Sequence, residues 1–117
     1  MMDNKVVLVT GSSRGIGRAT IIEFAKKGYN VVINYVNHEK EAFKLKEEVE
    51  KYNIKALCIK CDIRNENEIK DMFNQTIKEF NKIDVLVNNA GIAIDSTFDD
   101  KTKENENRRN TISIRLT

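Results

Sequence analysis

The chain has 117 residues, with 20 lysines and arginines against 18 aspartates and glutamates and a net charge of +2. These charges are spread through the sequence, whereas nucleic-acid-binding domains cluster basic residues on one face. No stretch approaches the roughly 20 apolar residues of a membrane span, and no signal-peptide pattern opens the chain. We therefore expect no nucleic-acid partner, no membrane association and a cytoplasmic location.

The first predicted element is a strand that leads directly into a glycine-rich turn. Residues 6–9 form a short apolar run rich in valine, and residues 11–17 read G-S-S-R-G-I-G. Apolar residues then recur at helical spacing, which predicts a helix from about Ile16 to Lys27 that ends at Gly28. Strand, glycine turn and helix together form the context in which a helix N-terminus binds a phosphate group.

Each glycine of this turn has its own expected task. Gly11 can leave the strand in a tight turn, Gly15 can let a pyrophosphate approach the backbone, and Gly17 can let the helix pack closely on the strand. The spacing is G-x-x-x-G-x-G rather than the common G-x-G-x-x-G. The plain alternative is a glycine turn that only joins a strand to a helix.

The rest of the chain continues to alternate strands with helices. Helical periodicity appears twice and short apolar runs appear three times, which indicates βαβ units and a parallel sheet. The expected elements are a strand at Asn30–Tyr35, a helix at His38–Tyr52, a strand at 55–61, a helix from the Asn65 cap to Phe80, and a strand at Ile83–Asn89. Glu68, three residues after Asn65, is placed to complete a capping box.

The predicted fold class is α/β, a Rossmann-like doubly wound parallel sheet of about four strands in the order 3-2-1-4. The first two helices should cover one face and the third helix the other. We expect a dinucleotide-binding domain over residues 1–98. Residues 99–117 should form a polar tail, partly ordered or disordered, in which I-S-I-R-L-T alternates like a short strand.

Cys58 and Cys61 form the sequence C-I-K-C within the third predicted strand. Residues three apart in a strand point to opposite faces, and a zinc site would need a second pair of ligands. We therefore interpret both cysteines as structural, and predict no metal site.

Three local sequences together resemble the short-chain dehydrogenase/reductase family. They are T-G-S-S-R-G-I-G at 10–17, C-D-I at 61–63 and N-N-A-G at 88–91. Within the family, V-V-I-N-Y and D-V-L-V-N-N-A-G-I are most similar to the 3-oxoacyl-acyl-carrier-protein reductases. The resemblance covers about residues 5–99 and implies an oxidoreductase acting on a carbonyl or hydroxyl substrate.

The resemblance also implies which residues bind the dinucleotide. Asp62 would accept a hydrogen bond from the adenine amino group. The plain alternatives are that Asp62 is a helix-entry carboxylate and that Asn88 is a turn residue. The full implied set is Gly11, Ser13, Arg14, Gly15, Ile16 and Gly17 at the pyrophosphate and adenosine, Asp62 and the Ile63 backbone at the adenine, and Asn88, Ala90 and Gly91 at the ribose.

The choice of cofactor can be argued from charge. An NAD site usually has a carboxylate after the second strand, whereas an NADP site has a cation near the 2′-phosphate. Here Asn34 and Tyr35 occupy the carboxylate position, and both are candidate cofactor-binding residues. Arg14 projects from the glycine loop, where a guanidinium can pair with phosphate. NADP(H) is therefore favoured over NAD.

The family's catalytic machinery is not found in this sequence. The family uses a tyrosine with a lysine four residues later, and none of Tyr29, Tyr35 and Tyr52 has a lysine at that spacing. We predict no catalytic residue and interpret the chain as the truncated cofactor-binding part of an NADP(H)-dependent oxidoreductase. The alternatives are a non-catalytic dinucleotide-binding or interaction module and an inactive relic.

The fourth predicted strand suggests self-association. Ile83–Val87 is a nearly continuous apolar run of the kind buried within a sheet. The polar segment Asp99–Asn110 has no aliphatic or aromatic side chain to cover it. An open strand edge invites pairing with another chain, so we expect a homo-oligomer joined through this edge.

Overall fold

The structure, a computed structural model, describes residues 4–89 and the backbone of residues 112–115. In these residues strands alternate with helices, and their bounds lie within a few residues of those expected. The elements are β1 (Val6–Val9), α1 (Gly15–Lys26), β2 (Asn30–Tyr35), α2 (Glu39–Val49), the 3-10 helix η1 (Glu50–Tyr52), β3 (Ala56–Lys60), α3 (Glu66–Phe80), β4 (Val85–Asn88) and β5 (Ile112–Arg115).

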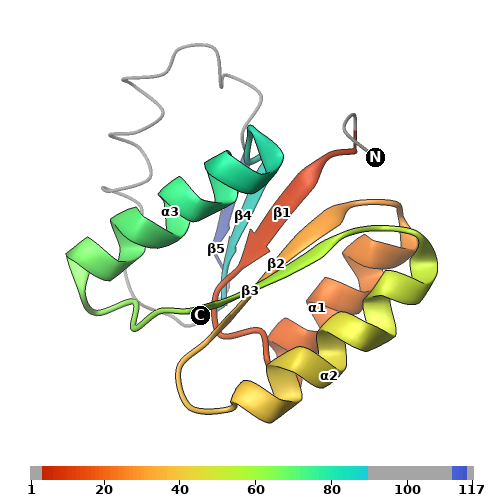
Figure 1. Ribbon diagram of the computed structural model, residues 1–117, viewed down its shortest axis with the longest axis horizontal. Helices are drawn as coiled ribbons and strands as arrows, with labels where there is room; N and C mark the ends of the chain where they lie inside the picture. Colours follow the sequence, from red (N-terminus) through yellow and green to blue (C-terminus); the bar gives the residue numbers. More distant parts are fainter. Residues whose placement is uncertain (1–3, 90–111, 116–117) are drawn as a thin grey trace.

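The strands form one parallel sheet in the order β3-β2-β1-β4-β5 (Figure 1). The predicted order 3-2-1-4 is confirmed, and β5 adds a fifth strand that comes from the expected tail. β5 pairs with β4 from Val85–Ile112 to Asn88–Arg115. The expectation of an open β4 edge is therefore wrong, because the backbone of the same chain occupies it. Association of two copies stays a prediction, but it cannot use that edge. The segment Asp99–Asn110 lies outside the described residues.

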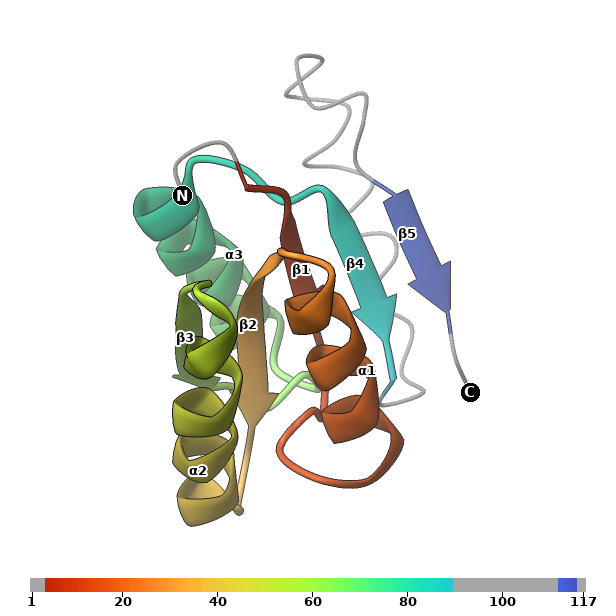
Figure 2. The same cartoon turned by 90° about the vertical axis from the view of Figure 1, so that its right-hand side faces the viewer.

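Alternation along the strands divides the core between the two faces of the sheet. Leu8 points to the face covered by α3, where it belongs to the same buried cluster as Met72 and Phe73. Val7 points to the opposite face and shares its cluster with Ile21 of α1 and Leu45 of α2. Figure 2 shows α1 and α2 in front of the sheet and α3 behind it. The predicted placement of the three helices is confirmed.

Helix α1 ends in a Schellman motif, as Gly28 predicts. The N–H of Gly28 donates to the Ala25 carbonyl at 3.0 Å and that of Tyr29 to the Phe24 carbonyl at 3.1 Å. Gly28 has φ +90°, a conformation that costs other residues energy. The rings of Phe24 and Tyr29 pack edge to face at 4.8 Å, which adds the apolar contact typical of this motif.

The other two helices depart from the sequence expectation at one end each. The helix expected over His38–Tyr52 becomes the 3-10 helix η1 in its last turn, so Tyr52 leaves the buried stripe and is exposed. Asn65 caps α3 by accepting from the Glu68 N–H, as predicted. The Glu68 carboxylate, however, accepts from the Asp62 N–H at 2.9 Å rather than closing a capping box on Asn65.

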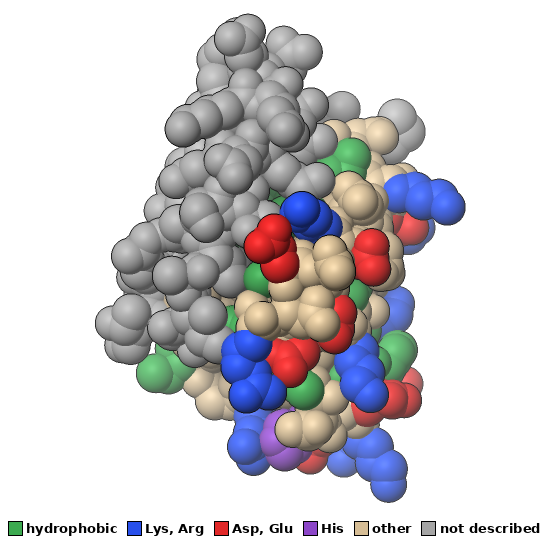
Figure 3. All heavy atoms as spheres, turned by 90° about the vertical axis from the view of Figure 1, so that its left-hand side faces the viewer, with side chains coloured by type: hydrophobic (Ala, Val, Ile, Leu, Met, Phe, Trp, Pro, Cys, Tyr) green, Lys and Arg blue, Asp and Glu red, His purple; other side chains and the backbone are tan. Residues whose placement is uncertain are grey.

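The surface of the described part carries charges of both signs. Figure 3 shows acidic and basic side chains interspersed on the side of the molecule that carries α3. Ion pairs there include Lys70–Glu66 on α3 and Arg64–Asp62 just before it. Among the described residues, no helix is both long and apolar enough to cross a membrane.

Two phenylalanines test this description of the core. Phe73 is 1% exposed between α3 and the sheet, whereas Phe43 on α2 is 45% exposed. We expect Phe73→Ala to lower the free energy of unfolding by about 3–5 kcal/mol through lost burial and a cavity. Phe43→Ala should cost about 1 kcal/mol or less. Urea denaturation measures both, and equal losses would contradict the assignment of Phe73 to the core.

Candidate functional site

The glycine loop lies at the carboxyl edge of the sheet, between the end of β1 and the start of α1. Because all strands are parallel, Tyr35 at the end of β2, Asp62 after β3 and Asn88 at the end of β4 belong to the same edge. Helices α1 and α2, which connect the strands on the β2 side of β1, cover one face of the sheet. Helix α3, which leads to β4 on the other side of β1, covers the opposite face. Ligands of open α/β sheets bind in the crevice at such a switch point.

Gly17 sets how closely α1 approaches this loop. A Cβ at Gly17 would lie 2.8 Å from both Asn89 Nδ2 and Ser12 Cα, and closer still to the Gly11 carbonyl oxygen. Two of these atoms, the Gly11 oxygen and Ser12 Cα, belong to the backbone and cannot move aside as a side chain can, so the first turn of α1 accepts only glycine at this position. The close packing expected at Gly17 is confirmed. Among the residues that the structure describes, a Cβ at Gly15 would meet no atom within 4 Å, so none of them fills the space beside Gly15.

The β2 side of the loop is held by a buried asparagine. Asn34 Oδ1 accepts from the Gly11 N–H at 2.9 Å, and Asn34 Nδ2 donates to the Cys61 carbonyl at 3.0 Å. The backbone N–H of Asn34 also donates to Ser12 Oγ at 3.0 Å. The side-chain amide of Asn34 therefore makes its hydrogen bonds inside the protein, between the glycine loop and the end of β3.

Side chains at the end of β4 hold the other side of the loop. Thr10 Oγ1 donates to Asn88 Oδ1 at 3.2 Å, and Asn89 Nδ2 donates to the Gly11 carbonyl at 3.0 Å. Sequence reasoning selected Asn88 but missed Thr10, Ser12 and Asn89. All three lie inside the motifs that carried the resemblance, which was the available signal. Ala90 and Gly91 lie outside the described residues.

The N-terminus of α1 is the least neutralised of the three helix starts. The first turns of α2 and α3 each carry two glutamates, whereas the first turn of α1 carries no acidic residue. Its first N–H groups have no partner within the helix, and the helix dipole favours an anion beside them. Arg14 is the N-cap residue, is exposed and makes no side-chain cap hydrogen bond. Ile16 is 70% exposed beside it, and Ser13 is buried within the loop.

Asp62 is engaged in a local ion pair at the expected adenine end of the site. Its Oδ1 accepts from Arg64 Nε at 3.1 Å and its Oδ2 from Arg64 NH2 at 3.0 Å. These side-chain hydrogen bonds, followed by the bond from the Arg64 N–H, lower the pKa of Asp62. The carboxylate is therefore an ionised acceptor at neutral pH. Ile63 is buried beside it.

Tyr35 closes β2 as a buried ring rather than an exposed one. It packs edge to face against Phe43 at a centroid distance of 6.3 Å. Burial raises the pKa of Tyr35, and Glu39 and Cys58 raise it further. Its phenol stays protonated near neutral pH, so what the residue offers at this edge is a neutral donor and an apolar wall.

The two cysteines point to opposite faces of the sheet, as the strand spacing predicts. Cys61 belongs to the cluster under α3, and Cys58 packs against the cluster under α1 and α2. Burial raises the pKa of each thiol to about 11, so both stay protonated and poorly nucleophilic at neutral pH. Among the described residues no three histidine, cysteine or acidic side chains gather as metal ligands.

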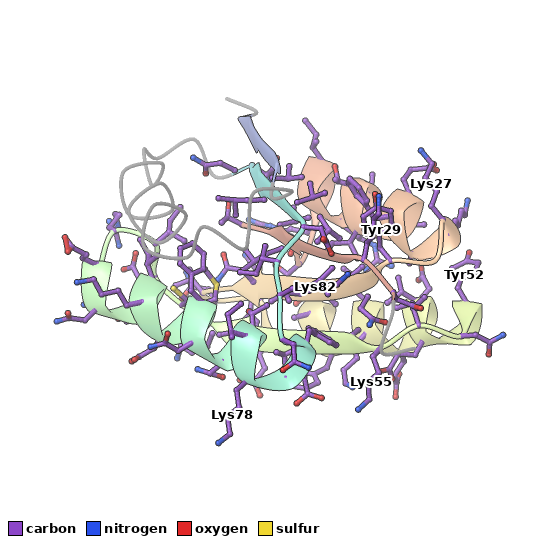
Figure 4. All side chains as sticks on the ribbon, turned by 90° about the horizontal axis from the view of Figure 1, so that it is seen from above. Lys27, Tyr29, Tyr52, Lys55, Lys78 and Lys82 are labelled. Carbon is purple, nitrogen blue, oxygen red and sulfur yellow. The ribbon has the colours of Figure 1, made fainter. Side chains whose placement is uncertain are left out.

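A surface pocket of about 410 Å³ lies at the opposite, amino edge of the sheet. Figure 4 shows Lys55 and other labelled lysines around this end. Its two charged side chains, Lys55 and Glu79, already pair with each other at 3.3 Å, so the pocket presents no unpaired charge. Its lining residues are Asn30, Asn53, Ile54, Lys55, Glu79, Phe80 and Asn81.

A comparison with known protein families identifies the family of this chain. A family model for short chain dehydrogenases matches residues 5–117. The chain therefore belongs to the short-chain dehydrogenase/reductase family.

Within this family, the chain is similar to curated 3-oxoacyl-acyl-carrier-protein reductases. The 3-oxoacyl-acyl-carrier-protein reductase of Staphylococcus epidermidis is 40% identical over 93 residues, covering 80% of this chain and 38% of the relative. The corresponding reductase of Staphylococcus aureus is 38% identical over 96 residues, covering 82% of this chain and 39% of the relative. The chain thus spans about two fifths of the length of these relatives.

Solved structures share the fold at lower identity. A chain from Burkholderia xenovorans, described as a short-chain dehydrogenase/reductase, superimposes with a TM-score of 0.71 at 24% identity, covering 74% of this chain and 36% of that one. A dehydrogenase from Burkholderia cenocepacia with bound NADP gives a TM-score of 0.70 at 23% identity, covering 74% and 34%. These likenesses support the Rossmann-type architecture.

Two glycines at opposite ends of α1 test the close contact. Gly17→Ala should push the first turn away from the loop and weaken dinucleotide binding about tenfold or more. Gly28→Ala meets no atom within 4 Å but must adopt φ +90°. It should cost about 1–2 kcal/mol of stability without changing affinity. Calorimetric titration with NADP⁺ and urea denaturation measure the two effects, and a Gly17→Ala chain that binds normally would contradict the contact.

Proposed function

We propose that this chain is the NADP(H)-binding part of an oxidoreductase that acts on a carbonyl or hydroxyl substrate, of the 3-oxoacyl reductase type. The observation that carries the proposal is the glycine loop at the sheet's switch point, with an unneutralised helix N-terminus and, beside Gly15, space that none of the described residues fills. Family membership and 40% identity to a 3-oxoacyl-acyl-carrier-protein reductase support it. The binding residues, the assignment to residues 1–98 and a cytoplasmic location stay predictions.

The preference for NADP(H) rests on the charge around the end of β2. Asn34 is buried and internally bonded, and Tyr35 is buried and neutral, so neither supplies the carboxylate that selects a ribose 2′-hydroxyl. Arg14 is an exposed cation at the start of α1 with no ion pair among the described residues. A related structure from Burkholderia cenocepacia holds NADP. The 2′-phosphate is the group that Arg14 would recognise.

The positions of the tyrosines support the proposal that this arrangement binds the cofactor without supplying the general acid of the reaction. Tyr29 directly precedes β2, and Tyr52 precedes the short segment that leads into β3. Both tyrosines therefore lie toward the amino edge of the sheet, away from the glycine loop (Figure 4). Tyr35 lies at the carboxyl edge, but its pKa is raised rather than lowered. A general acid needs a positioned donor of suitable pKa. The positions of the tyrosines and the raised pKa of Tyr35 therefore favour a second candidate function, a dinucleotide-binding module without catalysis.

Arginine substitutions test the cofactor choice. Arg14→Ala should weaken NADPH binding about 10- to 100-fold through loss of a charge-assisted contact, and NADH binding only slightly. Arg18→Ala is the matched control, because Arg18 pairs with Glu48 of α2 at 2.8 Å and is thereby held away from the loop. Competition titrations with both cofactors give the ratio. Equal losses for NADPH and NADH would contradict the assignment of Arg14.

Assays of the purified 117-residue chain test the separation of binding from chemistry. We expect NADPH binding without reduction of 3-oxoacyl thioesters or simple ketones at any pH, because no tyrosine has a lysine four residues later. NADPH absorbance measures turnover. Activity that survives repurification and disappears in Gly17→Ala would overturn the prediction, whereas absence of NADPH binding would overturn the proposed function.

A further inference from the structure

Asn34 occupies a position from which it can control the shape of the site without touching a ligand. We propose that Asn34 is a positioning residue for dinucleotide binding, whose carboxamide ties the glycine loop to the end of β3 so that the two halves of the site move as one unit. The inference rests on the proposed function. Nothing in the sequence pattern distinguishes this role from direct contact, because only the burial and bonding of the side chain separate them.

The contacts account for every hydrogen-bonding group of the side chain. Asn34 is 1% exposed. Its Oδ1 accepts from the Gly11 N–H at 2.9 Å, and its Nδ2 donates to the carbonyls of Cys61 at 3.0 Å and Ile59 at 3.4 Å. Gly11 opens the pyrophosphate loop, and Cys61 directly precedes Asp62 at the adenine end. One side chain therefore bridges the two segments that would grip opposite parts of the dinucleotide.

Backbone bonds lock the orientation of that bridge. The Ser12 N–H donates to the Asn34 carbonyl at 2.9 Å, and the Asn34 N–H donates to Ser12 Oγ at 3.0 Å. Ser12 Oγ in turn donates to the Val9 carbonyl at 2.8 Å. Three hydrogen bonds thus connect the loop to Asn34 at the end of β2. Of the groups involved, only the side-chain carboxamide also bonds to the end of β3.

The donor and acceptor pattern makes a chemical test available. An ionised carboxylate at position 34 would face the two carbonyl oxygens of Ile59 and Cys61 and could donate to neither. Repulsion from these oxygens would move the carboxylate out of the position in which Asn34 Oδ1 accepts from the Gly11 N–H. Burial and these carbonyls would raise its pKa. Once protonated, the carboxyl group has an acceptor for the Gly11 N–H and one O–H that can donate to the Cys61 carbonyl, which restores the two shorter of the three bonds of the amide. Asn34→Asp should therefore be defective at higher pH and repaired by protonation as the pH falls.

A second asparagine on the same strand supplies the matched control. Asn30 begins β2 at the amino edge, is 4% exposed and accepts from the Lys55 N–H at 2.9 Å. An ionised carboxylate there keeps its acceptor role toward Lys55. Asn30→Asp should change stability at most, and should leave the glycine loop unaffected across the same pH range.

The experiment uses the whole chain and two readouts between about pH 5 and about pH 8, the range in which a buried carboxyl of raised pKa titrates. NADP⁺ affinity is measured by calorimetry and compared with wild type at each pH. Protection of the Gly11 amide against hydrogen exchange is measured by NMR in the ligand-free chain. At the upper pH Asn34→Asp should bind about tenfold more weakly than wild type and lose Gly11 protection. Both should recover at the lower pH.

The outcomes separate the inference from the proposed function. Asn34→Leu should be defective at every pH, and if it does not fold, the pH response of Asn34→Asp still decides. A wild-type chain that binds no NADP⁺ overturns the proposed function, and with it the inference. If the wild-type chain binds NADP⁺, two results overturn the inference alone. One is that the affinity of Asn34→Asp relative to wild type, or its Gly11 protection, does not change with pH. The other is that the same change appears in Asn30→Asp.

Discussion

The contact between the first turn of α1 and the turn after β1 is the constraint on which the site depends. There is no room for a side-chain carbon between Gly17 and the Gly11 carbonyl. The helix therefore starts against the end of the strand, and its N-terminal N–H groups are placed at the carboxyl edge of the sheet. A larger residue at Gly17 would shift the helix that covers Val7 and Val9, so the same contact links the core to the site.

The central position of β1 explains how this loop is held. β1 lies between β2 and β4, so side chains from both neighbouring strands reach the loop that follows it. Asn34 comes from β2, while Asn88 at the end of β4 and Asn89 just after it come from the other side. Among the described residues, helices cover different faces of the sheet on the two sides of β1, which is the arrangement in which open α/β sheets bind ligands above such a loop.

Burial gives these polar contacts their importance. A buried amide must be hydrogen-bonded, and losing one partner costs more than the bond itself contributed. Asn34 satisfies this requirement with three hydrogen bonds to two segments, the glycine loop and the end of β3, which favours one loop geometry over others. The same burial keeps the thiols of Cys58 and Cys61 protonated, with pKa values of about 11, so the end of β3 contributes structure rather than sulfur chemistry.

The elements and the glycine loop could be predicted from local signals, namely valine-rich strands, helical apolar spacing and the Gly28 helix end, because each of these depends on near neighbours in the chain. The strand order followed from the rules for the connections of doubly wound sheets. The sequence also placed Cys58 and Cys61 on opposite faces, since strand residues alternate. The tertiary structure alone decided that β5 covers the β4 edge, that the last turn expected of α2 becomes η1, and that Asn34 faces inward. Each of these features depends on contacts between segments that are far apart in the sequence. The periodicity of apolar residues along the chain carries no information about such contacts.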